Sequence, residues 1–210
     1  MFIDVIDVGM GNIRSISNIL SRLGISCRIV SEANSLTSRT LILPGVGSAR
    51  PFMQKIHAGQ FDTAIKEHTR KGNKLIGICL GFQVLTEFSE EDGGTKCLGL
   101  IKTNTVHLNK SYNLANHNQW ENFSLRKQEF CLAKDSESIA LQRLSVVRGR
   151  VFYNHEYGVE IPKKSSSFKQ INPTNLSSFA SMYLKDNIIG IQFHPEKSQV
   201  TGLKLLSMLL

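Results

Sequence analysis

A cysteine between two glycines is the first feature of the sequence that could do chemistry. The segment GICLG at residues 77–81 closes a short apolar run, Lys74 to Cys79, and leads into helical spacing. A strand that stops at a nucleophile and turns at once into a helix needs very small neighbours two residues away on each side. The start of that helix would favour the Cys79 thiolate. This motif alone leaves two interpretations of Cys79 open: a nucleophile, or a small buried hydrophobe, which is the common role of a free cysteine.

The segment QFHPE at residues 192–196 supplies a base for such a nucleophile. A predicted strand from Ile188 to Phe193 ends at His194, and Pro195 cannot continue strand pairing. His194 and Glu196 are separated by one residue, so in an extended segment their side chains point to the same side. The carboxylate can then orient the imidazole as the third member of a Cys–His–acid triad. Glu196 could instead charge the start of the final helix, and the two roles are compatible.

Acyl transfer also requires hydrogen-bond donors for a developing oxyanion. The backbone N–H of Leu80, next after the nucleophile, is one candidate. A second donor is expected from the segment PGVG at residues 44–47, at Val46 or Gly47, because glycines allow close approach to a ligand. On its own this segment is equally compatible with an ordinary turn between a strand and a helix.

These residues need a scaffold that brings distant strand ends together. The alternation of strand-like and helical segments predicts an α/β fold with a mainly parallel open sheet and helices on both faces. Ligands bind such sheets at the carboxyl ends of the strands. Beyond about Leu98, short alternating runs predict added antiparallel strands in the C-terminal half. The predicted strands cover Phe2–Val8, Ser26–Val30, Thr40–Leu43, Lys74–Cys79, Thr105–Leu108, Val151–Tyr153, Ser178–Leu184 and Ile188–Phe193. The predicted helices cover Ile13–Leu23, Phe61–Lys71, a segment through Phe82 and Phe88, and the chain from near Ser198 onward, and 163–175 is predicted to be a loop.

The composition is that of one globular domain, which we expect to cover residues 1–210. The hydrophobic fraction of 41% and the charged fraction of 20% are ordinary, and no apolar stretch is long enough to predict a membrane span. The four cysteines form no CxxC pair, and without an export signal we expect reduced thiols in the cytoplasm. A net charge of +8 raises the question of nucleic acid, but the basic residues are dispersed and no binding motif accompanies them. We expect no nucleic-acid partner.

Neither a cofactor nor a metal is expected. Gly9 and Gly11 hint at a dinucleotide-binding turn, but Arg14 occupies the position of the third glycine. Among the other histidines, His57 and His68 lie in polar, helical surroundings and are predicted to face solvent.

The motifs GMGN, LPGVGS, GICLGFQ and FHPEKS, in this order over almost the whole chain, together resemble the class I, triad-type glutamine amidotransferases. The resemblance implies a flavodoxin-like fold and hydrolysis of L-glutamine to glutamate and ammonia through a cysteine thioester. Within that class, GMGNIRS, PGVG and FHPEKSQVTGLKLL are most similar to the glutaminase subunit of imidazole glycerol phosphate synthase, which serves histidine biosynthesis.

The resemblance also implies roles for further residues. Gln83 and Glu91 would hold the glutamine substrate, and Gly47 and Leu80 fall in the oxyanion elements. A heterodimer is implied as well, with a (β/α)₈ synthase subunit that receives the ammonia and makes imidazole glycerol phosphate and AICAR. The residues implied to face that subunit are Asn12, Trp120 and Lys197.

Two segments depart from the histidine-pathway pattern. ANHNQWE at 115–121 stands where a PHMGWN-like segment is usual, and VFYNHEY at 151–157 stands for a YFVHSY-like strand. These departures leave open a paralogue that supplies ammonia for a sugar of bacterial surface polysaccharide, and they leave His117 and His155 as either interface or core residues. Two further alternatives are another acyl transferase or cysteine peptidase and a catalytically silent regulatory module. The Gln83 and Glu91 pair argues against the first, and the complete triad against the second.

Overall fold

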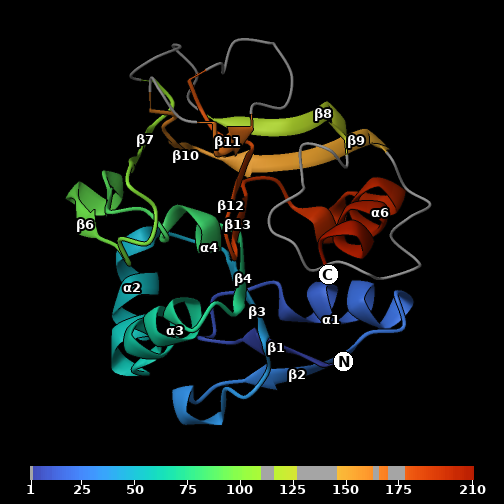
Figure 1. Ribbon diagram of the computed structural model, residues 1–210. Coiled ribbons are helices and arrows are strands. Elements are labelled where there is room, and N and C mark those ends of the chain that lie inside the picture. Colours follow the sequence, from blue (N-terminus) through green and yellow to red (C-terminus); the bar gives the residue numbers. More distant parts are fainter. Residues whose placement is uncertain (1, 110–115, 127–145, 163–165, 170–177) are drawn as a thin grey trace.

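The computed structural model describes residues 2–109, 116–126, 146–162, 166–169 and 178–210 (Figure 1). Most of the loop predicted over 163–175 lies outside these residues, as do Ala115 and Cys131.

A seven-stranded sheet runs through the middle of the molecule in the order β11-β12-β13-β4-β3-β1-β2 (Figure 1). The neighbours from β13 to β2 pair in parallel, whereas β11 and β12 add antiparallel pairing at one edge. The predicted mainly parallel sheet is therefore confirmed. The strands are β1 (Phe2–Ile6), β2 (Ser26–Val30), β3 (Thr40–Gly45), β4 (Lys74–Cys79), β11 (Phe168–Lys169), β12 (Met182–Lys185) and β13 (Ile188–Ile191).

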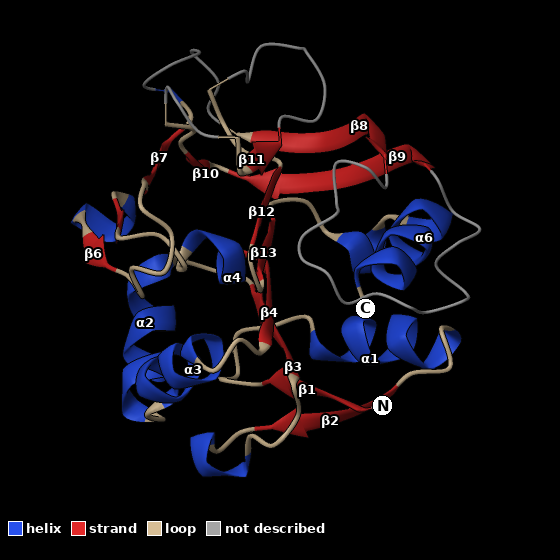
Figure 2. Ribbon diagram, viewed as in Figure 1, coloured by secondary structure: helices blue, strands red, loops and turns tan. Residues whose placement is uncertain are grey.

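Helices cover both faces of this sheet, as predicted (Figure 2). On one face lie α1 (Ile13–Arg22) and α6 (Gln199–Leu209), and on the other lie α2 (Ala49–Ala58), α3 (Phe61–Arg70) and the short α4 (Leu80–Gln83). The face with α1 and α6 and the face with α2 and α3 each bury their own hydrophobic core against the sheet.

Two helical predictions need correction. The sequence reading gave no helix over Ala49–Ala58, although Phe52, Met53 and Ile56 of α2 are buried at helical spacing. Conversely, the helix predicted to reach Phe88 ends at Gln83, and Phe88 instead belongs to strand β5. At the end of the helix, the Thr86 hydroxyl donates a hydrogen bond of 2.7 Å to the Gln83 carbonyl. A side chain thus bonds a backbone acceptor of the last helical residue.

Two smaller β-structures confirm the antiparallel additions. A four-stranded sheet has the order β10-β7-β5-β6, formed by β10 (Tyr157–Val159), β7 (Asn104–His107), β5 (Phe88–Ser89) and β6 (Thr95–Lys96). A two-stranded ribbon pairs β8 (His117–Arg126) with β9 (Val146–His155). Side chains from the ribbon, such as Phe123 and Val151, join the core that α6 covers. Short 3₁₀ turns cover Ala33–Ser35 (η1), Glu91–Gly93 (η2) and Pro195–Lys197 (η5).

The two histidines that were predicted to face solvent differ from each other. His57 is exposed, as predicted, and its Nδ1 lies 3.1 Å from Asp62 Oδ2. His68 is only 8% exposed, and its Nε2 lies 3.0 Å from the Lys74 carbonyl, so the prediction that it faces solvent is wrong. It lies on the side of α3 that packs on β4. Within the described ranges, no helix combines the length and apolarity needed to cross a bilayer.

Candidate active site

The nucleophile turn has the strained geometry that its glycines predict. Cys79 ends β4 with φ 54° and ψ −114°, a conformation that residues with a side chain rarely adopt. A Cβ on Gly77 would lie 2.7 Å from the Gly81 carbonyl oxygen, and one on Gly81 would overlap the carbonyl oxygen of Leu43. Only glycine fits at both positions, because the backbone comes close to the start of α4 at Gly77 and to β3 at Gly81.

The triad predicted from sequence assembles at the carboxyl ends of two neighbouring strands. Strand β13 pairs in parallel with β4, with Ile191 opposite Ile78, so the chain that leaves β13 reaches His194 beside Cys79. His194 Nδ1 lies 2.8 Å from Glu196 Oε1, and both side chains are almost completely buried. The same-side arrangement expected for these two residues is therefore present.

The charge state of His194 follows from these neighbours. Burial alone would lower the pKa of His194, but its hydrogen bonds and charge interactions with Cys79 and Glu196 outweigh burial and raise the pKa to about 10. Near neutral pH the imidazole is therefore protonated and lies between a sulfur and a carboxylate. An imidazolium in this place can donate a proton to a leaving group.

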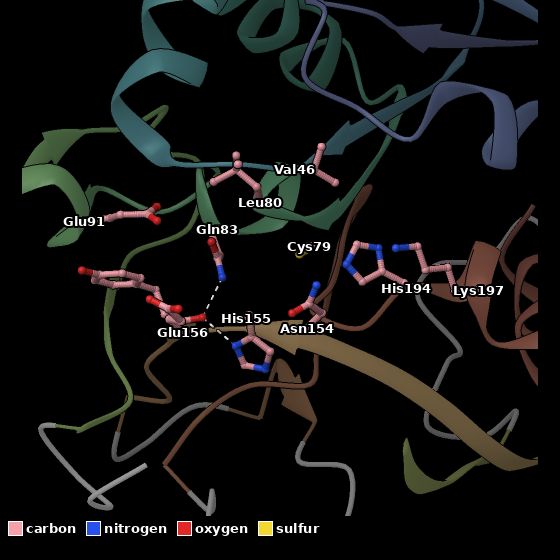
Figure 3. Close-up of a pocket in the computed structure, with 12 residues that line it drawn as sticks. Val46, Cys79, Leu80, Gln83, Glu91, Asn154, His155, Glu156, His194 and Lys197 are labelled. Carbon is pink, nitrogen blue, oxygen red and sulfur yellow. Dashed lines mark hydrogen bonds between the residues drawn. The ribbon is translucent and has the colours of Figure 1, made fainter. Parts of the chain in front are cut away.

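A pocket opens over the nucleophile between the main sheet and the ribbon end of β9 (Figure 3). Glu91 lies at the far end of the pocket from His194 and Lys197, and Gln83 and Cys79 lie between them (Figure 3). The pocket is lined by Val46, Gly47, Cys79, Leu80, Gln83, Glu91, Asn154, His155, Glu156, Tyr157, His194 and Lys197. Most of the site residues predicted from sequence thus line one cavity.

Gln83 and Glu91 present hydrogen-bond acceptors to this cavity. Gln83 Nε2 donates to the Tyr157 carbonyl at 2.7 Å and to Gln192 Oε1 at 3.2 Å, so both amide hydrogens are used and its oxygen is left for a ligand. Glu91 Oε2 accepts from the Ala49 N–H at 2.8 Å. Burial raises the pKa of Glu91 to about 7. A carboxylate and an amide oxygen in one pocket suit a ligand that carries an ammonium group.

The residues predicted to donate to an oxyanion differ in whether their N–H groups are free. Leu80 follows the nucleophile directly and lines the pocket, as does Gly47, whose φ is 98°. The Val46 N–H, however, donates to the Met10 carbonyl at 2.9 Å. Val46 can serve the oxyanion only if this hydrogen bond breaks, which leaves the Gly47 N–H as the other candidate.

The three residues implied to face a partner have different surroundings. Asn12 Nδ2 donates to Glu196 Oε1 at 3.2 Å and so touches the triad. Lys197 Nζ lies 5.8 Å from the centre of the Phe152 ring, at the pocket. Trp120 lies apart from the pocket on β8, beside Arg150, in a hollow with exposed Val200.

Sequence reasoning missed Gln192 and left His155 without a role. Gln192 is 1% exposed, and its Nε2 lies 3.9 Å from the Cys79 sulfur. His155 lines the pocket and contacts the Tyr157 carbonyl at 2.7 Å. The position of Gln192, two residues before the base on the strand beside the nucleophile, was the available signal.

Known proteins with similar sequences have been described as subunits of imidazole glycerol phosphate synthase. The "Imidazole glycerol phosphate synthase subunit HisH" of Caldanaerobacter subterraneus subsp. tengcongensis is 35% identical over 211 residues, which cover 97% of this chain and 95% of that protein. The subunit of the same name from Bacillus subtilis is 32% identical over 216 residues, covering 98% and 93%.

Solved structures share the fold at lower identity. PurLQS from Thermotoga maritima has a TM-score of 0.69 at 18% identity and covers 99% of this chain and 97% of its own. A crystal structure described as a glutamine amidotransferase has a TM-score of 0.68 at 15% identity, covering 98% and 96%. The family model "Glutamine amidotransferase class-I" matches residues 4–207. The chain therefore belongs to the class I glutamine amidotransferase family.

Proposed function

We propose that this protein is the glutaminase subunit of imidazole glycerol phosphate synthase, acting in the cytoplasm in histidine biosynthesis. The observation that carries the chemistry is the Cys79–His194–Glu196 arrangement over a pocket with an acceptor pair at its far end. The names of the relatives, which this chain matches over nearly its full length, support the pathway.

Glutamine fits the pocket in one direction. Its α-ammonium group would bind the Glu91 carboxylate and the Gln83 amide oxygen, and its side-chain amide would extend toward Cys79 (Figure 3). The acceptors at one end of the pocket and the nucleophile at the other would thus select a substrate that carries both an ammonium group and an amide. Binding of glutamine in this direction gives a role to Gln83 and Glu91, which a general acyl transferase or peptidase does not need.

The reaction proceeds in two stages. The Cys79 thiolate attacks the amide carbon, and the Leu80 and Gly47 N–H groups stabilise the oxyanion. The His194 imidazolium gives its proton to the leaving nitrogen, so that ammonia departs and a glutamyl thioester forms. His194 then takes a proton from water, which attacks the thioester and releases glutamate and the thiolate. Glu196 holds the imidazole for both transfers.

The partner is proposed to be a (β/α)₈ synthase subunit in a heterodimer. Lys197 and Asn12 lie next to the triad, and Trp120 lies in the neighbouring hollow at the start of α6. Val200 in that hollow is 59% exposed, and an exposed large apolar side chain beside a tryptophan favours protein contact. A partner seated there would lie close to the point at which ammonia is released.

The test is glutamate release from glutamine by the chain alone and with the synthase barrel of the source organism's histidine pathway plus its nucleotide substrate. Strong stimulation, absent from Cys79→Ala, is the expected result. Val200→Asp should weaken the stimulation while the Cys79 thiol stays reactive. If the barrel gives no stimulation although a glutamine analogue still alkylates Cys79, the proposed pathway is wrong and a polysaccharide-pathway partner takes its place.

A further inference from the structure

Gln192 is a buried amide that contacts the nucleophile. It follows β13 directly, and because Ile191 pairs with Ile78 in parallel register, Gln192 and Cys79 emerge side by side. Its Nε2 lies 3.9 Å from the Cys79 Sγ, within range of an N–H···S hydrogen bond. The side chain is 1% exposed, so water does not compete for this amide.

The orientation of the Gln192 amide is fixed by Gln83. Gln83 Nε2 donates to Gln192 Oε1 at 3.2 Å and to the Tyr157 carbonyl at 2.7 Å. If Gln192 flipped, its NH₂ would face the NH₂ of Gln83, and its oxygen would face the sulfur of Cys79. Both contacts would be repulsive, so Gln192 presents its N–H groups to the sulfur.

The orientation of Gln83 depends in turn on the end of the ribbon. The Tyr157 carbonyl also lies 2.7 Å from His155 Nδ1, and His155 Nε2 lies 2.9 Å from His117 Nδ1. Burial lowers the pKa of His155 to about 3, so this imidazole is neutral. Its one proton is on Nδ1, toward the carbonyl, and its Nε2 accepts from His117. Donors and acceptors therefore alternate from His117 Nδ1 to the Cys79 sulfur.

We propose that Gln192 is a further catalytic residue, which stabilises the Cys79 thiolate by donating a hydrogen bond that Gln83, the Tyr157 carbonyl and His155 hold in place. The proposal rests on the proposed thioester chemistry. A bond to a charged sulfur is stronger than one to a neutral sulfur. It therefore favours the thiolate before attack. It also favours C–S cleavage in the second stage, when water has added and the electron pair of that bond returns to the sulfur.

The experiment follows alkylation of Cys79 by iodoacetamide against pH, by mass spectrometry of the Cys79 peptide. Iodoacetamide reacts with the thiolate and needs neither glutamine nor a partner. Gln192→Glu keeps the shape but replaces the donor by a carboxylate, and Gln192→Met keeps the length without a donor. We expect the pH midpoint of alkylation to rise by about one unit in Gln192→Met, since a hydrogen bond to a charged group contributes about 1.5 kcal/mol or more. The rise should be larger in Gln192→Glu.

Gln83→Met provides a second variant that leaves Gln192 in place. It removes the amide that orients Gln192, so the midpoint should rise by a smaller amount. Gln54→Glu, the same substitution at an exposed position on α2, is the matched control and should leave the midpoint unchanged. Circular dichroism verifies that each variant is folded.

An unchanged midpoint in a folded Gln192 variant would overturn the proposal, because a residue that only fills space does not change thiolate reactivity. If neither Gln192 variant folds, an unchanged midpoint in Gln83→Met overturns it. The proposed function fails separately, by the absence of glutamate release from the wild-type chain with its barrel. A shifted midpoint in that case would still establish the contact between Gln192 and the thiolate.

Discussion

The side-chain amide of Asn12 donates a hydrogen bond of 3.2 Å to the carboxylate of Glu196, although the two residues are 184 positions apart in the sequence. The oxygen that accepts it is the one that also holds His194. Asn12 lies at the start of α1, and Glu196 lies in η5 beside that helix. The N-terminal GMGN motif therefore reaches the carboxylate that we propose as the third member of the triad.

Asn12→Ala is expected to lower the rate of glutamine hydrolysis by about 10- to 100-fold, mainly in kcat, since it removes a hydrogen bond to a charged group. Asn12→Asp should cost more, because it sets a second carboxylate against Glu196. The measurement is glutamate release under saturating partner, with Asn18→Ala, an exposed change on α1, as the control. Equal kcat values for the Asn12→Ala and Asn18→Ala variants would contradict the role.

Gly81→Ala is expected to destabilise the fold by more than about 3 kcal/mol, because its Cβ would overlap the Leu43 carbonyl oxygen and neither backbone can move freely. Urea unfolding measures the change. Gly24→Ala is the control: Gly24 has φ +71° with open space around it, so only the cost of the left-handed backbone, about 1 kcal/mol, applies. Similar losses in the free energy of unfolding for Gly81→Ala and Gly24→Ala would contradict the prediction, because they would show that β3 and the turn can move apart to admit the added Cβ.

Glutamine binding is expected to strengthen as the pH rises through about 7. The raised pKa of Glu91 leaves this carboxyl neutral at lower pH, and only the carboxylate attracts an ammonium group. The KM for glutamine should therefore fall across this range in the wild type. In Glu91→Gln it should be about 10- to 100-fold higher and independent of pH there. A KM that varies with pH equally in both proteins would assign the titration to another group.

His155 is expected to make the fold sensitive to acid. The unfolded imidazole binds a proton near pH 6.5, whereas burial lowers the pKa of folded His155 to about 3. The stability that it contributes is present above pH 6.5 and is lost as the pH falls toward 3. Urea unfolding of wild type and His155→Asn should give a stability difference that shrinks by up to about 1.4 kcal/mol per pH unit over this range. Parallel curves of stability against pH for the wild type and His155→Asn would contradict the prediction.

The end of β4 at Cys79 and the contact between His194 and Glu196 were predictable because they depend on local rules. Glycines flank Cys79 for steric reasons, and the one-residue spacing of His194 and Glu196 fixes a common side. The end of α4 at Gln83 was not predictable, because apolar residues at helical spacing continue beyond it, at Val84, Leu85 and Phe88. His68 looked exposed because its sequence neighbours are polar, although the sheet covers it. Gln192 was missed because its role depends on register between strands far apart in the sequence.

The backbone conformation of Cys79 lowers the stability of the fold, and activity requires a side chain at this position. Its φ of 54° and ψ of −114° suit glycine, so selection for folding alone would replace the nucleophile. The Cys79→Gly variant is therefore expected to unfold at a higher temperature or denaturant concentration than the active enzyme, but to hydrolyse no glutamine. Selection of variants for stability alone, without selection for turnover, should therefore enrich this inactive variant.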